Sequence, residues 1–152
     1  LDLINNFSSF CKLRQTNPLF ITSTRTPIEV EELIKEKFDV SMSVLYHSEK
    51  ARGKFDHLLY VADNIFVTED SSTMLSEAVS SGKKVISIFP QNINAPEKYL
   101  QIITKYQGLE FIERCSIENI DKFTFPRETN IQDKVDSSRK NFQRSLVERL
   151  KD

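Results

Sequence analysis

The chain has 152 residues, 39% hydrophobic and 28% charged, which is enough length and apolar content for one folded domain with a buried core. Its 21 basic and 22 acidic residues leave a net charge of -1, so the chain as a whole lacks the positive footprint of a nucleic-acid or anionic-membrane binding protein. The two cysteines, Cys11 and Cys115, are too far apart in sequence to indicate a disulfide framework or a zinc site.

The cysteine usage favours a reducing compartment, and we expect a cytoplasmic location, with peripheral attachment to a membrane as an alternative. No apolar run approaches the roughly 20 residues that a transmembrane helix needs, and no signal peptide is evident. Because the sequence begins at Leu1 rather than at a methionine, we expect one domain of a longer protein.

The first helix is predicted over Leu3–Leu13, where apolar residues recur at helical spacing until Asn17-Pro18 ends the pattern. The apolar run Leu19–Ser23 predicts a strand that is buried on both faces. The next helix is expected to begin at Pro27, with Thr26 as its cap.

A second strand is predicted at Met42–Tyr46, followed by a polar loop. A helix is expected at Phe55–Ala62 and a third strand at Ile65–Thr68. The helix after that strand covers about Ser72–Ser81 and is followed by Gly82, at the place of a helix C-cap glycine.

The same alternation continues to the end of the chain, as a strand at Val85–Phe89, a helix around Tyr99–Tyr106 closed by Gly108, a short strand at Leu109–Ile112, a loop with a helical turn at Ile117–Arg127 and a helix at Ile131–Leu150. Strands that alternate with helices predict a parallel sheet between helical layers. We therefore expect one three-layer, Rossmann-like α/β domain over residues 1–152.

A hydroxyl-rich segment connects the third predicted strand to its helix. Ser71, Ser72 and Thr73 lie where the helix begins, and a helix start offers free N–H groups and a partial positive charge to an anion. Helix capping alone accounts for one of these residues but not for the whole run. Capping and contact with a phosphate both stay open, and we favour phosphate contact.

Glu77 stands four residues after Thr73, so both project from the same side of the predicted helix. A carboxylate one turn into such a helix can accept hydrogen bonds from the two hydroxyls of a ribose, as an acidic residue does in dinucleotide-binding folds. The alternative is a solvated glutamate that stabilises the helix dipole.

A second polar segment, Ser23, Thr24 and Arg25, follows the first predicted strand. The planar guanidinium of Arg25 suits a diphosphate, and the two hydroxyls lie beside it in sequence. A surface ion pair is an equally good interpretation of Arg25. If both polar segments follow strands of one parallel sheet, they open on the same edge and form a nucleotide site.

The loop after the second predicted strand contains His47, Lys50 and Arg52, which are candidates for contact with the base or for closing over phosphates. A solvated loop is the alternative for Lys50 and Arg52, and a surface or structural histidine is the alternative for His47. No metal-ligand spacing is present, and with three glycines the chain lacks the fingerprints of NAD sites and P-loops. A dehydrogenase or a P-loop kinase is therefore disfavoured.

Four segments of the chain resemble the carboxyl-terminal half of the elongated-mitochondria fission-factor family of bacteria and plants, namely Thr22 to Pro27, Ala62 to Ser71, Met74 to Ala78 and Gly82-Lys83. The resemblance covers about Leu19 to Phe89. That family is in turn similar to the GT-B glycosyltransferases, whose carboxyl-terminal Rossmann-like domain holds a nucleotide-sugar donor.

The resemblance implies a donor-binding domain for a UDP- or GDP-type sugar, with no further cofactor. Ser71, Ser72 and Thr73 would match the diphosphate turn and Glu77 the ribose-binding glutamate. The turn has no glycine here, and Thr24-Arg25 replaces a pair of arginines, so a single guanidinium carries over.

The resemblance also implies an amino-terminal partner domain that supplies the acceptor site, so this segment would bind a donor without catalysing the transfer, and no catalytic residue is assigned. Two hypotheses follow. The chain is the donor-binding part of a GT-B-like glycosyltransferase, or it is a binding or scaffold module that kept the fold and lost the reaction.

Overall fold

The computed structural model describes residues 1–48, 54–91, 96–125 and 131–149. Its contacts divide the chain into two compact units. We call residues 1–62 with 115–124 the amino-terminal unit, and residues 63–114 with 125–152 the sheet unit, and describe each by itself. The prediction of a single domain stays a prediction.

The described residues of the amino-terminal unit form the helices α1 (Asp2–Arg14), α2 (Ile28–Lys37) and α3 (Phe55–Val61) and the 3-10 helix η1 (Ile117–Lys122). The helices expected at its start and before residue 62 are thus confirmed. Two side chains of α1 hold the η1 segment, because Asn6 donates to the carbonyl of Ile117 at 3.1 Å and Arg14 to that of Phe123 at 2.9 Å.

The two strands predicted for this unit are wrong in extent. In the described residues they reduce to one parallel bridge, between Ile21 and Val44. The ladder stops because side chains replace backbone partners on both sides of the bridge. The Phe20 N–H donates to the hydroxyl of Ser43 at 3.0 Å, and the Tyr46 N–H donates to the hydroxyl of Thr22 at 2.8 Å.

The cap assigned to the second helix is also wrong. Helix α2 begins at Ile28 with Pro27 as its N-cap and has no side-chain cap bond. The hydroxyl of Thr26 instead accepts the N–H of Ser23 at 3.2 Å, while the Thr26 N–H donates to the Ser23 carbonyl at 2.9 Å. Thr26 therefore closes a tight turn before the helix.

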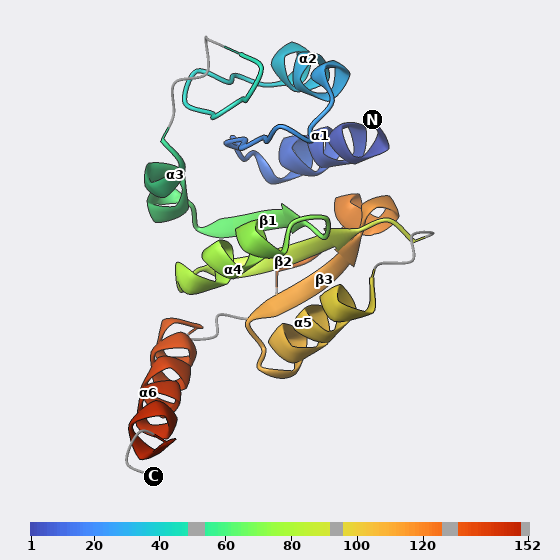
Figure 1. Ribbon diagram of the computed structural model, residues 1–152. Coiled ribbons are helices and arrows are strands. Elements are labelled where there is room, and N and C mark those ends of the chain that lie inside the picture. Colours follow the sequence, from blue (N-terminus) through green and yellow to red (C-terminus); the bar gives the residue numbers. More distant parts are fainter. Residues whose placement is uncertain (49–53, 92–95, 126–130, 150–152) are drawn as a thin grey trace. The chain divides into compact units, whose positions relative to one another are not determined.

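The sheet unit is built on a three-stranded parallel sheet in the order β1 (Asn64–Thr68), β2 (Lys84–Phe89), β3 (Ile112–Ser116). Strands β1 and β2 pair in register, with Ile65 opposite Val85 and Thr68 opposite Ile88. Helix α4 (Ser72–Ser80) connects β1 to β2, and α5 (Glu97–Gly108) connects β2 to β3. Figure 1 shows both helices on the same face of the sheet.

The core of the sheet unit lies between that face and the helices. Leu75, Ala78 and Val79 of α4 are buried there, together with Val85 of β2 and Ile103 of α5. Small and branched apolar side chains at helical and alternating spacing account for this layer. The parallel α/β class is confirmed by these elements, whereas the third layer of the prediction stays untested.

The last predicted strand begins three residues later than expected. Leu109 and Glu110 still belong to the end of α5, because their N–H groups donate to the carbonyls of Lys105 and Gln107 at 3.1 and 3.0 Å. Glu110 has a φ of 57°, which reverses the chain. Strand β3 can therefore begin only at Ile112.

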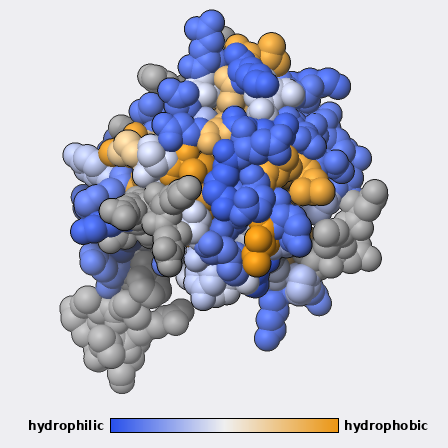
Figure 2. Space-filling model, turned by 90° about the horizontal axis from the view of Figure 1, so that it is seen from above, coloured by the Kyte–Doolittle hydropathy of each residue, from blue (hydrophilic) through white to orange (hydrophobic). Residues whose placement is uncertain are grey.

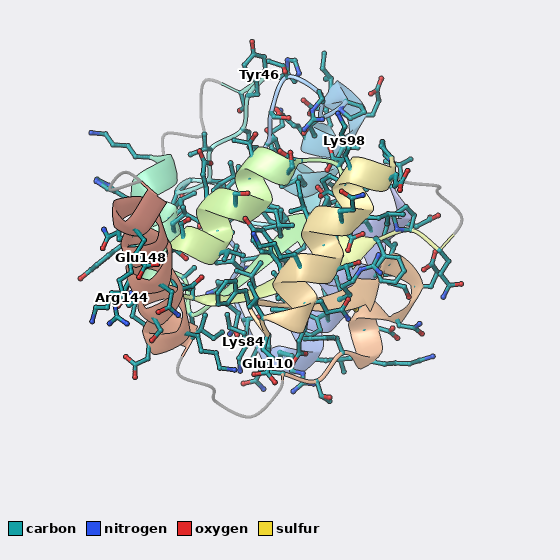
Figure 3. The ribbon with its side chains drawn as sticks, turned by 60° about the horizontal axis from the view of Figure 1, so that its bottom comes forward. Tyr46, Lys84, Lys98, Glu110, Arg144 and Glu148 are labelled. Atoms are coloured by element: carbon teal, nitrogen blue, oxygen red, sulfur yellow. The ribbon has the colours of Figure 1, made fainter. Side chains whose placement is uncertain are left out.

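Helix α6 (Ile131–Arg149) is close to the predicted span. Its first turns pack into the core of the sheet unit through Ile131 and Val135, and Arg139 donates to the Ser80 carbonyl at the end of α4 at 3.0 Å. Arg144 and Glu148 are exposed and project from α6 in Figure 3, so opposite charges alternate on this helix.

None of the helices in the described part of the chain has the length and hydropathy that crossing a bilayer requires. Figure 2 shows limited apolar areas within a mostly hydrophilic face. The exposed apolar side chains include Met42, which is 62% exposed, and Tyr46, which is 59% exposed.

Gly82 supports a prediction about backbone strain. It follows the C-cap residue Ser81 with a φ of +73°, and an added Cβ would lie 1.7 Å from the flexible end of Gln132. Gly82→Ala should lower the free energy of unfolding by about 1–2 kcal/mol, because a left-handed backbone disfavours every side chain. Urea unfolding measures the change.

Gly108→Ala is the matched control, since Gly108 ends α5 and has nothing within 4 Å of an added Cβ. It should raise stability by up to about 1 kcal/mol through lower chain entropy. Equal effects of the two substitutions would contradict the strain argument.

Candidate functional site

The turn between β1 and α4 is the corner that the sequence singles out. Ser71 is 9% exposed and is the N-cap of α4, because its hydroxyl accepts the Met74 N–H at 3.4 Å and its carbonyl accepts the Leu75 N–H at 3.0 Å. Capping by Ser71 is thus confirmed. The N–H groups of Ser72 and Thr73 belong to the first helical turn, which has no acceptors inside the helix.

The remaining predicted residues of this corner lie on its solvent side. Ser72 is half-buried, while Thr73 and Glu77 are exposed one turn apart on α4. The opposite side of the helix is buried against the sheet. First-turn N–H groups, two hydroxyls and a carboxylate therefore share one accessible helix end, which can bind an anion and an adjacent diol.

A buried ion pair stands immediately before this corner, and the sequence analysis missed it. Glu69 follows β1, and its side chain is 6% exposed. Arg114 of β3 donates from Nε to one carboxylate oxygen at 2.6 Å and from Nη2 to the other at 2.7 Å. Ser87 of β2 adds a third donor, at 2.7 Å.

The surroundings of Arg114 stabilise its charge. Its guanidinium lies 4.1 Å from the centre of the Phe89 ring, which attracts a cation through its π face. Its hydrogen bonds to Glu69 raise the pKa of the guanidinium above its ordinary value. Arg114 therefore carries a permanent positive charge that one buried carboxylate neutralises.

Whether Arg114 can leave Glu69 for a ligand depends on two free energies, the cost of breaking the ion pair and the gain from new hydrogen bonds to the ligand. Removing the cation from a buried carboxylate costs about 3–5 kcal/mol, whereas one hydrogen bond to a charged group contributes about 1.5–3 kcal/mol. The exchange is thus unfavourable unless a ligand replaces several bonds at once.

The sequence contained only a weak signal for this pair. Glu69 is a charged residue directly after a buried strand, and Arg114 interrupts the apolar pattern of a short strand 45 positions later. Each is ordinary by itself. Their pairing depends on the position of β3, which the analysis placed at Leu109–Ile112.

The second predicted group lies in the amino-terminal unit. Ser23 is half-buried, and its hydroxyl accepts the Arg25 N–H at 3.3 Å across the turn. Thr24 and Arg25 are exposed at the tip of that turn. The three residues follow the Ile21–Val44 bridge, as expected, although the strand before them is shorter than predicted.

A buried glutamate that sequence analysis missed organises this second group. Glu31 of α2 is 0% exposed. Its carboxylate accepts the Thr22 hydroxyl and, at 3.0 Å, the N–H of His47. The glutamate thereby holds the start of the turn and the exposed His47 segment. The signal in the sequence is weak: Glu31 stands three residues before Ile34, which places a carboxylate on the apolar side of α2.

The two groups belong to different units, so the common edge predicted for them stays a prediction. Lys50 and Arg52 lie outside the described residues. Within the described ranges, no cluster of three or more His, Cys, Asp or Glu side chains could hold a metal ion.

The end of the sheet opposite this corner is the end at which the strands begin. Lys84 begins β2 there, and Glu110 stands just before β3; both are labelled in Figure 3.

Comparison with known proteins gives one match. Residues 3–116 match the family model described as mitochondrial fission ELM1. No curated protein and no solved structure matches the chain. The match includes both polar groups and most of the sheet unit.

The buried pair yields a stability prediction. Arg114→Met should lower the free energy of unfolding by about 3 kcal/mol, because it leaves the Glu69 carboxylate buried without a cation. Adding Glu69→Gln should restore at least about 1 kcal/mol, since the charge is then removed as well. Urea unfolding of Arg114→Met, Glu69→Gln and the double variant gives the coupling free energy between the two residues.

Lys134→Met is the control for this cycle, because Lys134 pairs with the exposed Glu110 in the same unit. A surface pair contributes at most about 1 kcal/mol. If Arg114→Met lowers the free energy of unfolding no more than Lys134→Met does, the buried Glu69 carboxylate does not need its cation for stability.

Glu31 yields a prediction for the other unit. Glu31→Ala should cost about 2 kcal/mol, because it leaves the Thr22 hydroxyl and the His47 N–H without their acceptor. Glu32→Ala, at the exposed neighbour that pairs with Lys35, should cost less than about 1 kcal/mol. Thermal or urea unfolding measures the stability of the two variants. Similar losses of stability would argue against Glu31 as the acceptor that holds this turn.

Proposed function

We propose that the sheet unit binds the diphosphate and ribose of a nucleoside-diphosphate sugar. The chain belongs to the mitochondrial fission ELM1 family, and the proposal proceeds from this membership. The diphosphate would lie at the first turn of α4, against the N–H groups and hydroxyls of Ser72 and Thr73. The carboxylate of Glu77 would accept the two ribose hydroxyls. UDP and GDP are the first nucleotides to consider.

One observation carries this proposal. The accessible end of α4 combines first-turn N–H groups with two exposed side chains, Thr73 and Glu77, one turn apart. The N–H groups of the first turn favour a phosphate through charge and hydrogen bonding. The exposed side chains of Thr73 and Glu77 suit the hydroxyl groups of a ribose.

The proposed reaction class is sugar transfer of the GT-B type, with this chain as the donor-binding part. Ser23, Thr24 and Arg25 remain candidates from the sequence for diphosphate contact, and His47, Lys50 and Arg52 remain candidates from the sequence for contact with the base. No residue is assigned to the chemical step, because the acceptor would be held by another domain. A scaffold that retains the fold without the reaction is the alternative.

A nucleotide screen tests the proposal. UDP or GDP should raise the melting temperature of the chain by RT ln(1 + [L]/Kd), so a concentration of a hundred times Kd adds about 2.7 kcal/mol of stability. Glu77→Ala should abolish or strongly reduce the shift without lowering the basal melting temperature, because the side chain is exposed. ADP, CDP and TDP complete the panel.

Glu36→Ala provides the matched control, since Glu36 is likewise an exposed helical glutamate but lies in α2. It should leave any shift intact. Absence of a shift with every nucleotide would favour the scaffold hypothesis. A shift that survives Glu77→Ala would place the ribose elsewhere.

A further inference from the structure

The Glu69–Arg114 pair has no direct part in the proposed donor site. Thr73 and Glu77 are the exposed contacts of that site, whereas the Glu69 side chain is almost completely buried. Glu69 nevertheless stands two residues before Ser71, the cap from which α4 begins. Its interactions therefore control the turn that precedes the binding corner.

Glu69 is attached to both neighbouring strands. Its N–H donates to the Ile88 carbonyl of β2 at 2.8 Å, which extends the β1–β2 ladder by one residue. Its carboxylate accepts Ser87 of β2 and, through two bonds, Arg114 of β3. Backbone and side chain are thus held by different partners, so the residue can neither shift along the sheet nor rotate away from it.

Contact of Arg114 with a phosphate through Nε or Nη2 would break its pair with Glu69. Both donors are engaged with a carboxylate whose side chain is 6% exposed, and a ligand that took them would leave this buried carboxylate without its cation. The bidentate fork instead fixes the orientation of Glu69, as planar guanidinium groups do for carboxylates.

We infer that Arg114, acting through Glu69, is a positioning residue for the phosphate-binding end of α4. The pair holds the turn at residues 69–71, and that turn sets the direction of the N–H groups of Ser72 and Thr73. Displacement of binding groups by 1 Å can cost up to about a hundredfold in function. This inference rests on the proposed diphosphate site, but its structural half can be tested without a ligand.

Hydrogen exchange tests the structural half. In Glu69→Gln an amide replaces one acceptor oxygen with a donor, so it cannot accept both bonds from Arg114. The Met74 and Leu75 amides, both bonded to Ser71, should exchange at least about fivefold faster than in the unmodified chain, since local opening becomes easier. Amides of α5 serve as the internal reference for global stability.

Binding tests the functional half. The dissociation constants of UDP, GDP and inorganic pyrophosphate should rise at least about tenfold in Glu69→Gln and in Arg114→Lys, whose ammonium keeps the charge but cannot form the two parallel bonds. Lys134→Gln is the matched control, because it breaks another ion pair of the sheet unit. Circular dichroism confirms that each variant is folded before binding is measured.

Each outcome decides the inference. Faster exchange at Met74 and Leu75 together with weaker binding supports it. Tighter binding by Glu69→Gln overturns it, because Arg114 would then be a phosphate ligand that Glu69 blocks. Unchanged exchange also overturns it. If the unmodified chain binds none of the three probes, the proposed donor site fails, and the exchange experiment alone decides whether the pair positions α4.

Discussion

The buried carboxylate of Glu69 is the interaction on which the sheet unit depends. A charge with almost no access to water must receive donors from the protein, and here those donors come from two different strands, Ser87 of β2 and Arg114 of β3. The relative position of all three strands is therefore tied to one side chain. Apolar packing alone tolerates small shifts, whereas hydrogen bonds of 2.6–2.7 Å do not.

The amino-terminal unit solves the same physical problem with another glutamate. Glu31 comes from a helix rather than from a strand end, and its donors are a hydroxyl and a backbone N–H instead of a guanidinium. In both units the acceptor stands beside a polar turn that follows parallel strand pairing. Buried acceptors thus define the two turns that the sequence analysis selected for their exposed hydroxyl groups.

The sequence predicted most elements of the sheet unit because its periodic patterns are strong. Leu75, Ala78 and Val79 show the spacing of a helix packed on a sheet, and a glycine with positive φ follows that helix at position 82. Prediction failed where side chains compete with the backbone for hydrogen bonds. The hydroxyls of Thr22 and Ser43 shorten a strand pair in a way that no propensity reveals.

The candidate site was predictable to a similar degree. Thr73 and Glu77 were expected on one side of the helix because they stand four residues apart, and both are exposed on α4. The pairing of Glu69 with Arg114 was not predicted, because the two residues are 45 positions apart and meet only when the sheet forms. A buried ion pair between distant residues has no local signature, whereas a helix cap has one.

Hydrogen bonds from distant strands and helices hold helix α4 near both of its ends. Glu69, held by β3, precedes its first turn, and Arg139 of α6 binds the Ser80 carbonyl at its last. Nine residues of helix span only about 14 Å, a length over which an α-helix bends little. A rotation imposed at the carboxyl end of α4 would therefore also turn the side of the helix that carries Glu77.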